Sequence, residues 1–251
     1  MKYSLPSLLL AVSAMADDAV KALRAAAEKG EAKAQFRLAV HYIRGTGGLN
    51  KDLPTAAQWL RKAGAQGDGN AAYYLAIMHE HGDGVAKDKK LTLKWYGIAA
   101  AKGHPSAQHN LGVAYDEGDG LKKDRAKALK WFHLAAINGQ HRSQYNLGLA
   151  YASGDGVKKD LARAAKLYRA SALQGNMDAQ LNYGAMLAFG EGAPENLPEA
   201  YAWMRASARQ GKAKAAANVK LFEKNFSATE KAASAKAWAR VAKQLGLKTL
   251  D

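Results

Sequence analysis

The 251 residues are 48% hydrophobic and 24% charged, a composition that excludes a disordered chain. The absence of cysteine excludes a disulfide framework and thiolate chemistry or ligation. The formal net charge of +15 favours an acidic protein face, anionic lipid or nucleic acid as a partner, with plain solubility as an equal explanation.

The first sixteen residues have the pattern of an export signal. A single Lys2 precedes a short apolar run that ends Ala14-Met15-Ala16, and Asp17-Asp18 follow. This pattern predicts a signal peptide cut after Ala16, and therefore a periplasmic or secreted protein. The alternative is an apolar leader on a cytoplasmic protein. No other stretch is apolar enough to span a bilayer, so we expect no transmembrane segment.

Glycines recur through the rest of the chain at intervals of 36 residues. One series ends each unit, at Gly67, Gly103, Gly139, Gly175 and Gly211, and a second lies in the loop inside each unit, at Gly82, Gly118, Gly154 and Gly190. Apolar residues at helical spacing precede and follow each loop. Each unit is therefore predicted to be a helical hairpin that buries its apolar face against neighbouring copies.

The repeat predicts domain boundaries along the whole mature chain. Residues 17–33 are read as a partial repeat that caps the array, and residues 215–251 as a basic helical cap. The Ser227–Glu230 segment predicts a capping box for a last helix. Five full repeats lie between the caps, at 34–70, 71–106, 107–142, 143–178 and 179–214.

Individual positions have predicted structural roles. Asp88, Asp124 and Asp160 stand where a carboxylate can cap the second helix of a hairpin. The loop glycines are expected to have positive φ. In the third repeat, Trp131 is expected to lie in the core stripe of the second helix, facing Leu111 and Tyr115 of the first.

These residues resemble the Sel-one-like repeat, a member of the tetratricopeptide-like superfamily. The third repeat carries nearly the whole pattern, at Ala107, Leu111, Gly112, Tyr115, Gly118, Gly120, Asp124, Lys127, Ala128, Trp131, Ala135, Ala136 and Gly139. The resemblance covers residues 17–225 and implies an all-α fold, an α-solenoid of antiparallel hairpins forming a right-handed superhelix. It also implies a non-enzymatic scaffold for protein–protein contacts, with the partner left open.

The superfamily binds partners along the face lined by the first helix of each hairpin. With Leu111 and Tyr115 in the core, helical geometry places His109 and Val113 on the opposite face. The equivalent positions give the predicted partner-binding residues, which are Phe36, Arg37, Tyr73, Tyr74, Ile77, His109, Asn110, Val113, Tyr145, Asn146, Leu149 and Asn182. Asn110, Asn146 and Asn182 could bond an extended peptide. Alternatively, they only bond neighbouring helices.

Other chemistries have weaker signals. His79 and His81 flank one residue at a helix end and point apart, and the Gly-Asp-Gly turns lack the alternating ligands of a calcium loop. We therefore expect no metal, no cofactor and no catalytic residue. The sequence favours an exported adaptor or regulator of an envelope machine. The alternatives are an immunity protein that neutralises a secreted toxin and, less favoured, a cell-envelope hydrolase or a nucleic-acid binder.

Overall fold

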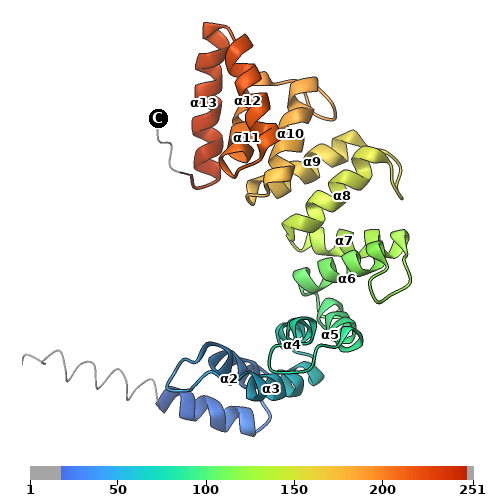
Figure 1. Cartoon of the computed structure of the whole chain (residues 1–251), viewed down its shortest axis with the longest axis vertical. Helices are drawn as coiled ribbons and strands as arrows, with labels where there is room; N and C mark the ends of the chain where they lie inside the picture. The colour runs from blue at the N-terminus through green and yellow to red at the C-terminus, as the bar shows by residue number, and fades with distance from the viewer. Residues whose placement is uncertain (1–17, 248–251) are drawn as a thin grey trace, which may run out of the picture. The chain divides into compact units, whose positions relative to one another are not determined.

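The computed structural model describes residues 18–247, so the predicted signal peptide lies outside the described residues. All regular structure in 18–247 is α-helical, and consecutive helices pack as hairpins, which confirms the predicted fold class. Within 18–247 the chain divides into two compact units, with the boundary between Asp124 and Arg125. Figure 1 follows the helices in chain order.

The first unit begins with a helix over residues 18–28, which packs on the first hairpin. Its α2 pairs with α3, α4 packs on both α3 and α5, and α6 packs on α5. The bounds are α2 Ala32–Arg44, α3 Leu53–Ala65, α4 Gly69–His81, α5 Lys89–Ala101 and α6 Pro105–Glu117.

The second unit contains α7, two further hairpins, and the helices α12 and α13. From α7 to α11 each helix packs on the next one along the chain, and α13 packs on α11. The bounds are α7 Arg125–Ile137, α8 His141–Ser153, α9 Leu161–Leu173, α10 Met177–Phe189, α11 Leu197–Arg209, α12 Ala213–Asn225 and α13 Ala228–Gln244.

Carboxylates begin the second helices as predicted. The side chain of Asp88 accepts a hydrogen bond from the backbone N–H of Leu91 at 2.9 Å, and Asp160 accepts one from Arg163 at 2.9 Å. Each bond satisfies an amide that has no partner inside its own helix. The capping box is also present, because Ser227 and Glu230 each bond the other's backbone N–H at the start of α13.

Two glycines shape each loop, for two different reasons. Gly154 ends α8 in the left-handed conformation, with φ 81°, which a residue without Cβ adopts at no steric cost. Gly156 also has positive φ, and a Cβ there would lie 2.7 Å from Cδ1 of Leu129 in the preceding repeat. The second glycine therefore also allows the loop to approach α7 closely.

The core is built from small residues and a few aromatic rings. Gly148 of α8 lies so close to α9 that a Cβ would come within 2.8 Å of the Tyr168 ring. The expectation for Trp131 is wrong, because its side chain is only partly buried while the adjacent Phe132 is almost fully buried. Tyr168, which is equivalent to Phe132, is buried in the same way. The residue after the tryptophan position therefore faces the hairpin core.

The last helix covers the end of the second unit. Trp238 of α13 is buried in the same core cluster as Trp203, and the guanidinium of Arg205 lies 4.8 Å from its ring centroid. Arg240 forms an ion pair with Glu199 of α11 at 3.1 Å. These contacts hold α13 against α11.

Candidate functional site

In the first unit, aromatic side chains of α2 and α4 form a connected surface. The rings of Phe36 and Tyr74 meet edge to face with centroids 5.6 Å apart, and Tyr73 stacks on His104 at 4.1 Å. All four side chains are partly exposed. Burial lowers the pKa of His104, so the stacked imidazole is neutral at physiological pH. The predicted residues Phe36, Tyr73 and Tyr74 thus lie together on one face.

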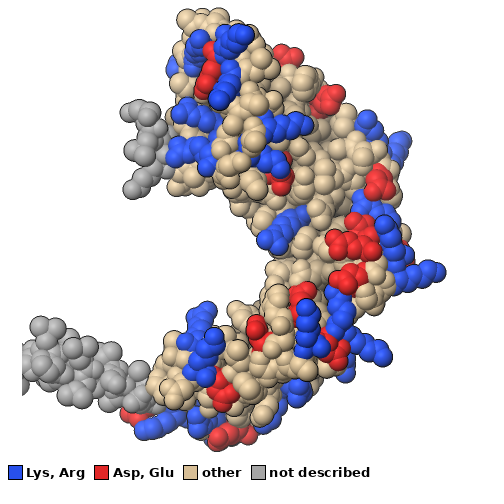
Figure 2. All heavy atoms as spheres, viewed as in Figure 1, with Lys and Arg blue, Asp and Glu red and all other residues tan. Residues whose placement is uncertain are grey.

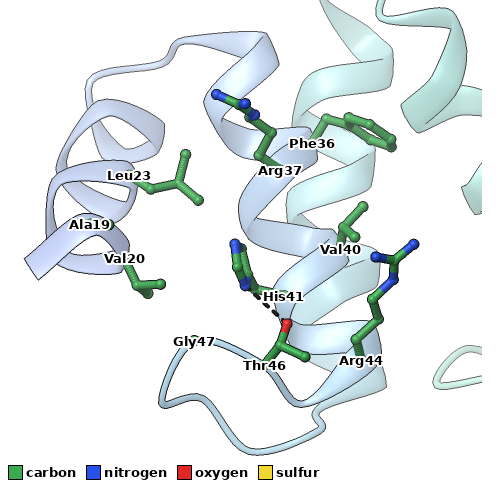
Figure 3. A pocket seen from close by; sticks show the side chains of 10 residues that line it. All are labelled: Ala19, Val20, Leu23, Phe36, Arg37, Val40, His41, Arg44, Thr46 and Gly47. Carbon is green, nitrogen blue, oxygen red and sulfur yellow. Dashed lines mark hydrogen bonds between the residues drawn. The ribbon is translucent and has the colours of Figure 1, made fainter. Parts of the chain in front are cut away.

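A hollow of about 710 Å³ lies between the helix over 18–28 and α2 (Figure 3). Its lining contains the predicted residues Phe36 and Arg37. Leu23 points from the first helix toward α2, and His41 Nδ1 hydrogen-bonds with Thr46 Oγ1 at 3.0 Å. The full lining is Ala19, Val20, Leu23, Phe36, Arg37, Val40, His41, Arg44, Thr46 and Gly47.

The rim of this hollow is cationic. Arg37 and Arg44 are exposed and line it, and neither forms an ion pair with any residue in 18–247. The lining contains no Asp or Glu. An apolar floor beneath two free guanidinium groups suits a ligand that combines an apolar side chain with a carboxylate.

Two of the predicted residues on α6 are less available. His109 is only 7% exposed, so its side chain offers little surface to a partner. Asn110 lies beside Tyr96 of α5 and acts on the pKa of its hydroxyl, which donates to Glu80 at 2.7 Å. Burial, followed by that carboxylate, strongly raises the pKa of Tyr96. Ile77 and Val113 are half-buried and keep part of their surface open.

In the second unit, Asn182 lies beside two tyrosines. Burial raises the pKa of both Tyr145 and Tyr168, and the side-chain amide of Asn182 lowers it in part. The ring centroids of the two tyrosines lie 5.9 Å apart. The amide of Asn182 is therefore directed at side chains of its own chain.

Asn146 differs from Asn110 and Asn182. The residue equivalent to Tyr96 and Tyr168 is Phe132, which has no hydroxyl group. Within 18–247, Asn146 has no hydrogen-bond partner for its side chain. Beside it on α8, Leu149 is 40% exposed. Asn146 and Leu149 are therefore the predicted residues of this unit that remain available to a ligand.

Sequence reasoning missed a set of buried glutamines that join successive helices in several of the repeats. Gln144 donates to the carbonyl of Ala136 in the preceding helix at 3.2 Å and accepts from Gln174 at 2.9 Å. Gln180 and Gln210 form the same arrangement, and Gln35 and Gln66 form it in the first unit. The signal was available, because glutamine follows the small residue that opens four of the five repeats.

The Gly-Asp-Gly turns make ion pairs between repeats. Asp155 pairs with Arg125 at 3.0 Å, and Asp119 pairs with Lys89. In each pair the cation lies in the first turn of the preceding repeat's second helix. Residues 18–247 contain no cluster of three or more His, Asp or Glu side chains that could hold a metal ion.

Repeated hairpins joined by these contacts define an α-solenoid, and the sequence assigns the family. Five Sel1 repeats match residues 32–68, 69–104, 105–140, 141–176 and 178–212. The chain therefore belongs to the Sel1 repeat family, whose members are generally non-enzymatic scaffolds that typically mediate protein–protein contacts. No curated protein matches the sequence significantly.

Solved structures of Sel1 repeat proteins are similar to this chain. A Sel1 repeat protein from Oxalobacter formigenes is 33% identical with a TM-score of 0.71, over 81% of this chain and 58% of its own. A protective antigen present in uropathogenic Escherichia coli strains is 32% identical with a TM-score of 0.57, over 90% of this chain and 56% of its own. The present chain thus spans a little more than half the length of each.

An immunity protein from Pseudomonas aeruginosa is 19% identical, with a TM-score of 0.45 over 86% of this chain and 81% of its own. That similarity is too low to indicate what the present chain binds.

Proposed function

We propose that this chain is a non-enzymatic scaffold that holds a segment of a partner protein against the first helices of its repeats. The observation that carries the proposal is the hollow of about 710 Å³ beside α2, with Arg37 and Arg44 on its rim and no carboxylate in its lining. Tyr73, Tyr74 and Ile77 extend the same partly exposed surface onto α4. Sel1 repeats typically serve protein–protein contacts, which supports this reading.

The partner we propose is an acidic protein. From Arg205 onward the sequence has eleven Lys and Arg against three Asp and Glu, a net charge of +8. Figure 2 shows Lys and Arg side chains over the region of α11 to α13. Together with the arginines at the first hollow, this field would raise the association rate of an acidic partner.

We further propose that the protein acts outside the cytoplasm, as an adaptor or regulator in the cell envelope. The support is the sequence pattern of residues 1–16, including the Ala14-Met15-Ala16 end. No helix within 18–247 is long and apolar enough to cross a membrane. Mass spectrometry of the native protein should find Asp17 at the N-terminus, and an intact Met1 would favour a cytoplasmic protein instead.

The decisive experiment is affinity purification from an envelope fraction, using the native chain and two variants of α2. Arg37→Glu reverses a charge on the rim of the hollow. Lys33→Glu makes the same reversal on the same helix at an exposed residue that does not line it. We expect a stoichiometric protein partner that is lost with Arg37→Glu and kept with Lys33→Glu. Equal behaviour of the two variants would contradict this site.

Each alternative function predicts a different experimental result. An immunity protein would return a secreted toxin as its partner and abolish the toxin's activity at one-to-one stoichiometry. A nucleic-acid binder would capture any DNA or RNA with strongly salt-dependent affinity. A cell-envelope hydrolase would show turnover that survives purification. Each of these results would support the corresponding function in place of the adaptor role.

A further inference from the structure

A tryptophan of the second helix closes the space between successive repeats in two places. Trp95 of α5 is buried against Gly64 of α3, where a Cβ would lie 3.1 Å from its ring. Trp203 of α11 is fully buried in the core cluster that also contains Ala172 of α9. In both places the indole ring fills the space between two successive second helices.

The fourth repeat has Leu167 at this position, and the space is open. Leu167 is only partly buried, and it packs on the cluster of Leu129, Ala136 and Leu147. Two hollows of about 580 and 360 Å³ lie there, and both are lined by His133, Leu147 and Tyr151. We call these adjoining hollows the α7–α9 groove.

The walls of the α7–α9 groove are apolar and accessible. Ile137 is 69% exposed and Leu134 is 44% exposed, and each lines one of the hollows. Val157 and Leu167 add partly exposed apolar surface. Large apolar side chains gathered around a depression mark an interaction surface, because single scattered ones would not form a hollow.

The charge around the groove has one sign. The helices α7, α8 and α9 contain no Asp or Glu. Lys130 lines one hollow and Lys166 the other, and neither has an ion-pair partner within 18–247. The nearby carboxylates are already paired, Asp155 with Arg125 and Asp160 with Arg163. The groove therefore presents an apolar floor between unpaired cations.

We propose that the α7–α9 groove is a second docking surface, which binds an acidic amphipathic helix of a partner protein. A helix with apolar residues on one side and carboxylates on the other matches the floor and the cations at once. Its apolar side chains fill the two hollows, and its carboxylates pair with Lys130 and Lys166. Its walls come from α7, α8, α9 and the loop after α8 in the second unit, whereas Phe36 and Arg37 belong to α2 of the first unit.

The test uses two synthetic helical peptides of about twenty residues, long enough to be helical in water. Both have the same leucine spacing, and their polar faces carry Glu in one and Lys in the other. Fluorescence anisotropy with the full chain should show binding of the Glu peptide, weakened by salt, and no binding of the Lys peptide. If neither peptide binds, or both bind equally, the proposal is wrong.

The decisive variant is Leu167→Trp, which restores the residue found in the other four repeats. We expect it to fold with unchanged or higher thermal stability. Its affinity for the Glu peptide should fall at least about tenfold, because the indole ring fills the hollow. Leu221→Trp makes the same change at a 59% exposed position on α12 and should bind normally. Unchanged affinity in Leu167→Trp would overturn the groove as the docking site.

A second variant covers the case in which Leu167→Trp fails to fold. Lys130→Glu with Lys166→Glu alters two exposed side chains and leaves the apolar floor intact. We expect this double variant to lose the Glu peptide and to bind the Lys peptide, because the sign of the rim is reversed. Continued preference for the Glu peptide would contradict the proposal. Arg37→Glu should leave peptide binding unchanged, which separates this surface from the proposed function.

Discussion

The Asn182 side chain lies beside Tyr168 of the preceding second helix and partly offsets the rise that burial gives to the pKa of its hydroxyl, whereas Phe132, the residue equivalent to Tyr168, offers no hydroxyl to Asn146. Two asparagines in the same place of the repeat therefore do different things. One is part of the packing between hairpins, and the other is left available on the surface that we propose for a partner.

We predict that Asn182→Ala destabilises the fold and that Asn146→Ala does not. Removing Asn182 takes its amide away from the Tyr168 hydroxyl, which should cost about 1 kcal/mol. Asn146 has no such partner to lose, so its truncation should change the free energy of unfolding by less than about 0.5 kcal/mol. Urea unfolding of the two variants measures the difference. Equal losses would show that Asn146 also has a structural role.

Alkaline pH should destabilise the fold through Tyr168. Burial, opposed in part by the Asn182 amide, raises the pKa of its hydroxyl to about 12. An unfolded tyrosine ionises near pH ~10, so the unfolded state loses this proton first as the pH rises. The stability contributed by the neutral hydroxyl is therefore complete below that pH and is lost as the pH approaches the folded pKa.

The matched control for this pH effect is Tyr168→Phe, which keeps the ring and removes the ionising group. Lysine deprotonation contributes equally to both chains, so their difference isolates Tyr168. The native chain should lose more stability than the variant across the alkaline range in urea titrations. Parallel losses in the two chains would refute the assignment.

Glycine substitutions in the second unit should separate backbone strain from crowding. Gly156 has φ 74°, and a Cβ there would lie 2.7 Å from Leu129. Gly175 has φ 88°, with nothing within 4 Å of a Cβ. Both alanine variants bear the strain of positive φ, of about 1 kcal/mol, and only Gly156→Ala adds overpacking of about 1–3 kcal/mol. Melting temperatures should therefore fall further for Gly156→Ala, and the reverse order would mean that the contact relaxes freely.

The buried glutamines should contribute more than their surface partners. Gln180 donates to the carbonyl of Ala172 at 3.1 Å and accepts from Gln210 at 2.8 Å. Gln180→Ala removes both bonds and leaves a small void, so we expect a loss of about 2–4 kcal/mol. Gln210→Ala removes one bond at an exposed residue and should cost about 1 kcal/mol. Chemical denaturation of the single variants checks this ranking.

The repeat, the helix caps and the hairpin fold could be predicted from the sequence, because each rests on local signals. Asp160, Gly154 and the Ser227–Glu230 box act within a few residues of their positions in the chain. Periodicity then places copies of the hairpin side by side. These parts of the prediction needed no knowledge of packing between repeats.

The candidate site could be predicted only in part, because availability depends on neighbours about a repeat away. His109 and Asn182 satisfy the same helical geometry as Tyr73 and Asn146, yet His109 is buried and Asn182 lies beside the Tyr168 hydroxyl. Asn146 stays available because the third repeat has Phe132 where its neighbours have Tyr96 and Tyr168. The hollow at Leu167 likewise depends on packing between repeats. A leucine in place of tryptophan leaves a space only because Ala136 and Leu147 lie opposite it.

The pairing of Gln144 with the carbonyl of Ala136 on one side and with Gln174 on the other recurs at Gln35 and Gln180, so these three junctions are chemically alike. The acceptor is a backbone carbonyl near the end of a second helix, a group that every repeat has. Any repeat can therefore be followed by one that opens with this glutamine. A gene encoding such a chain can gain or lose whole copies by unequal recombination without creating a mismatched joint. The number of repeats, and with it the length of surface offered to a partner, is therefore free to vary in evolution while the joint itself stays fixed.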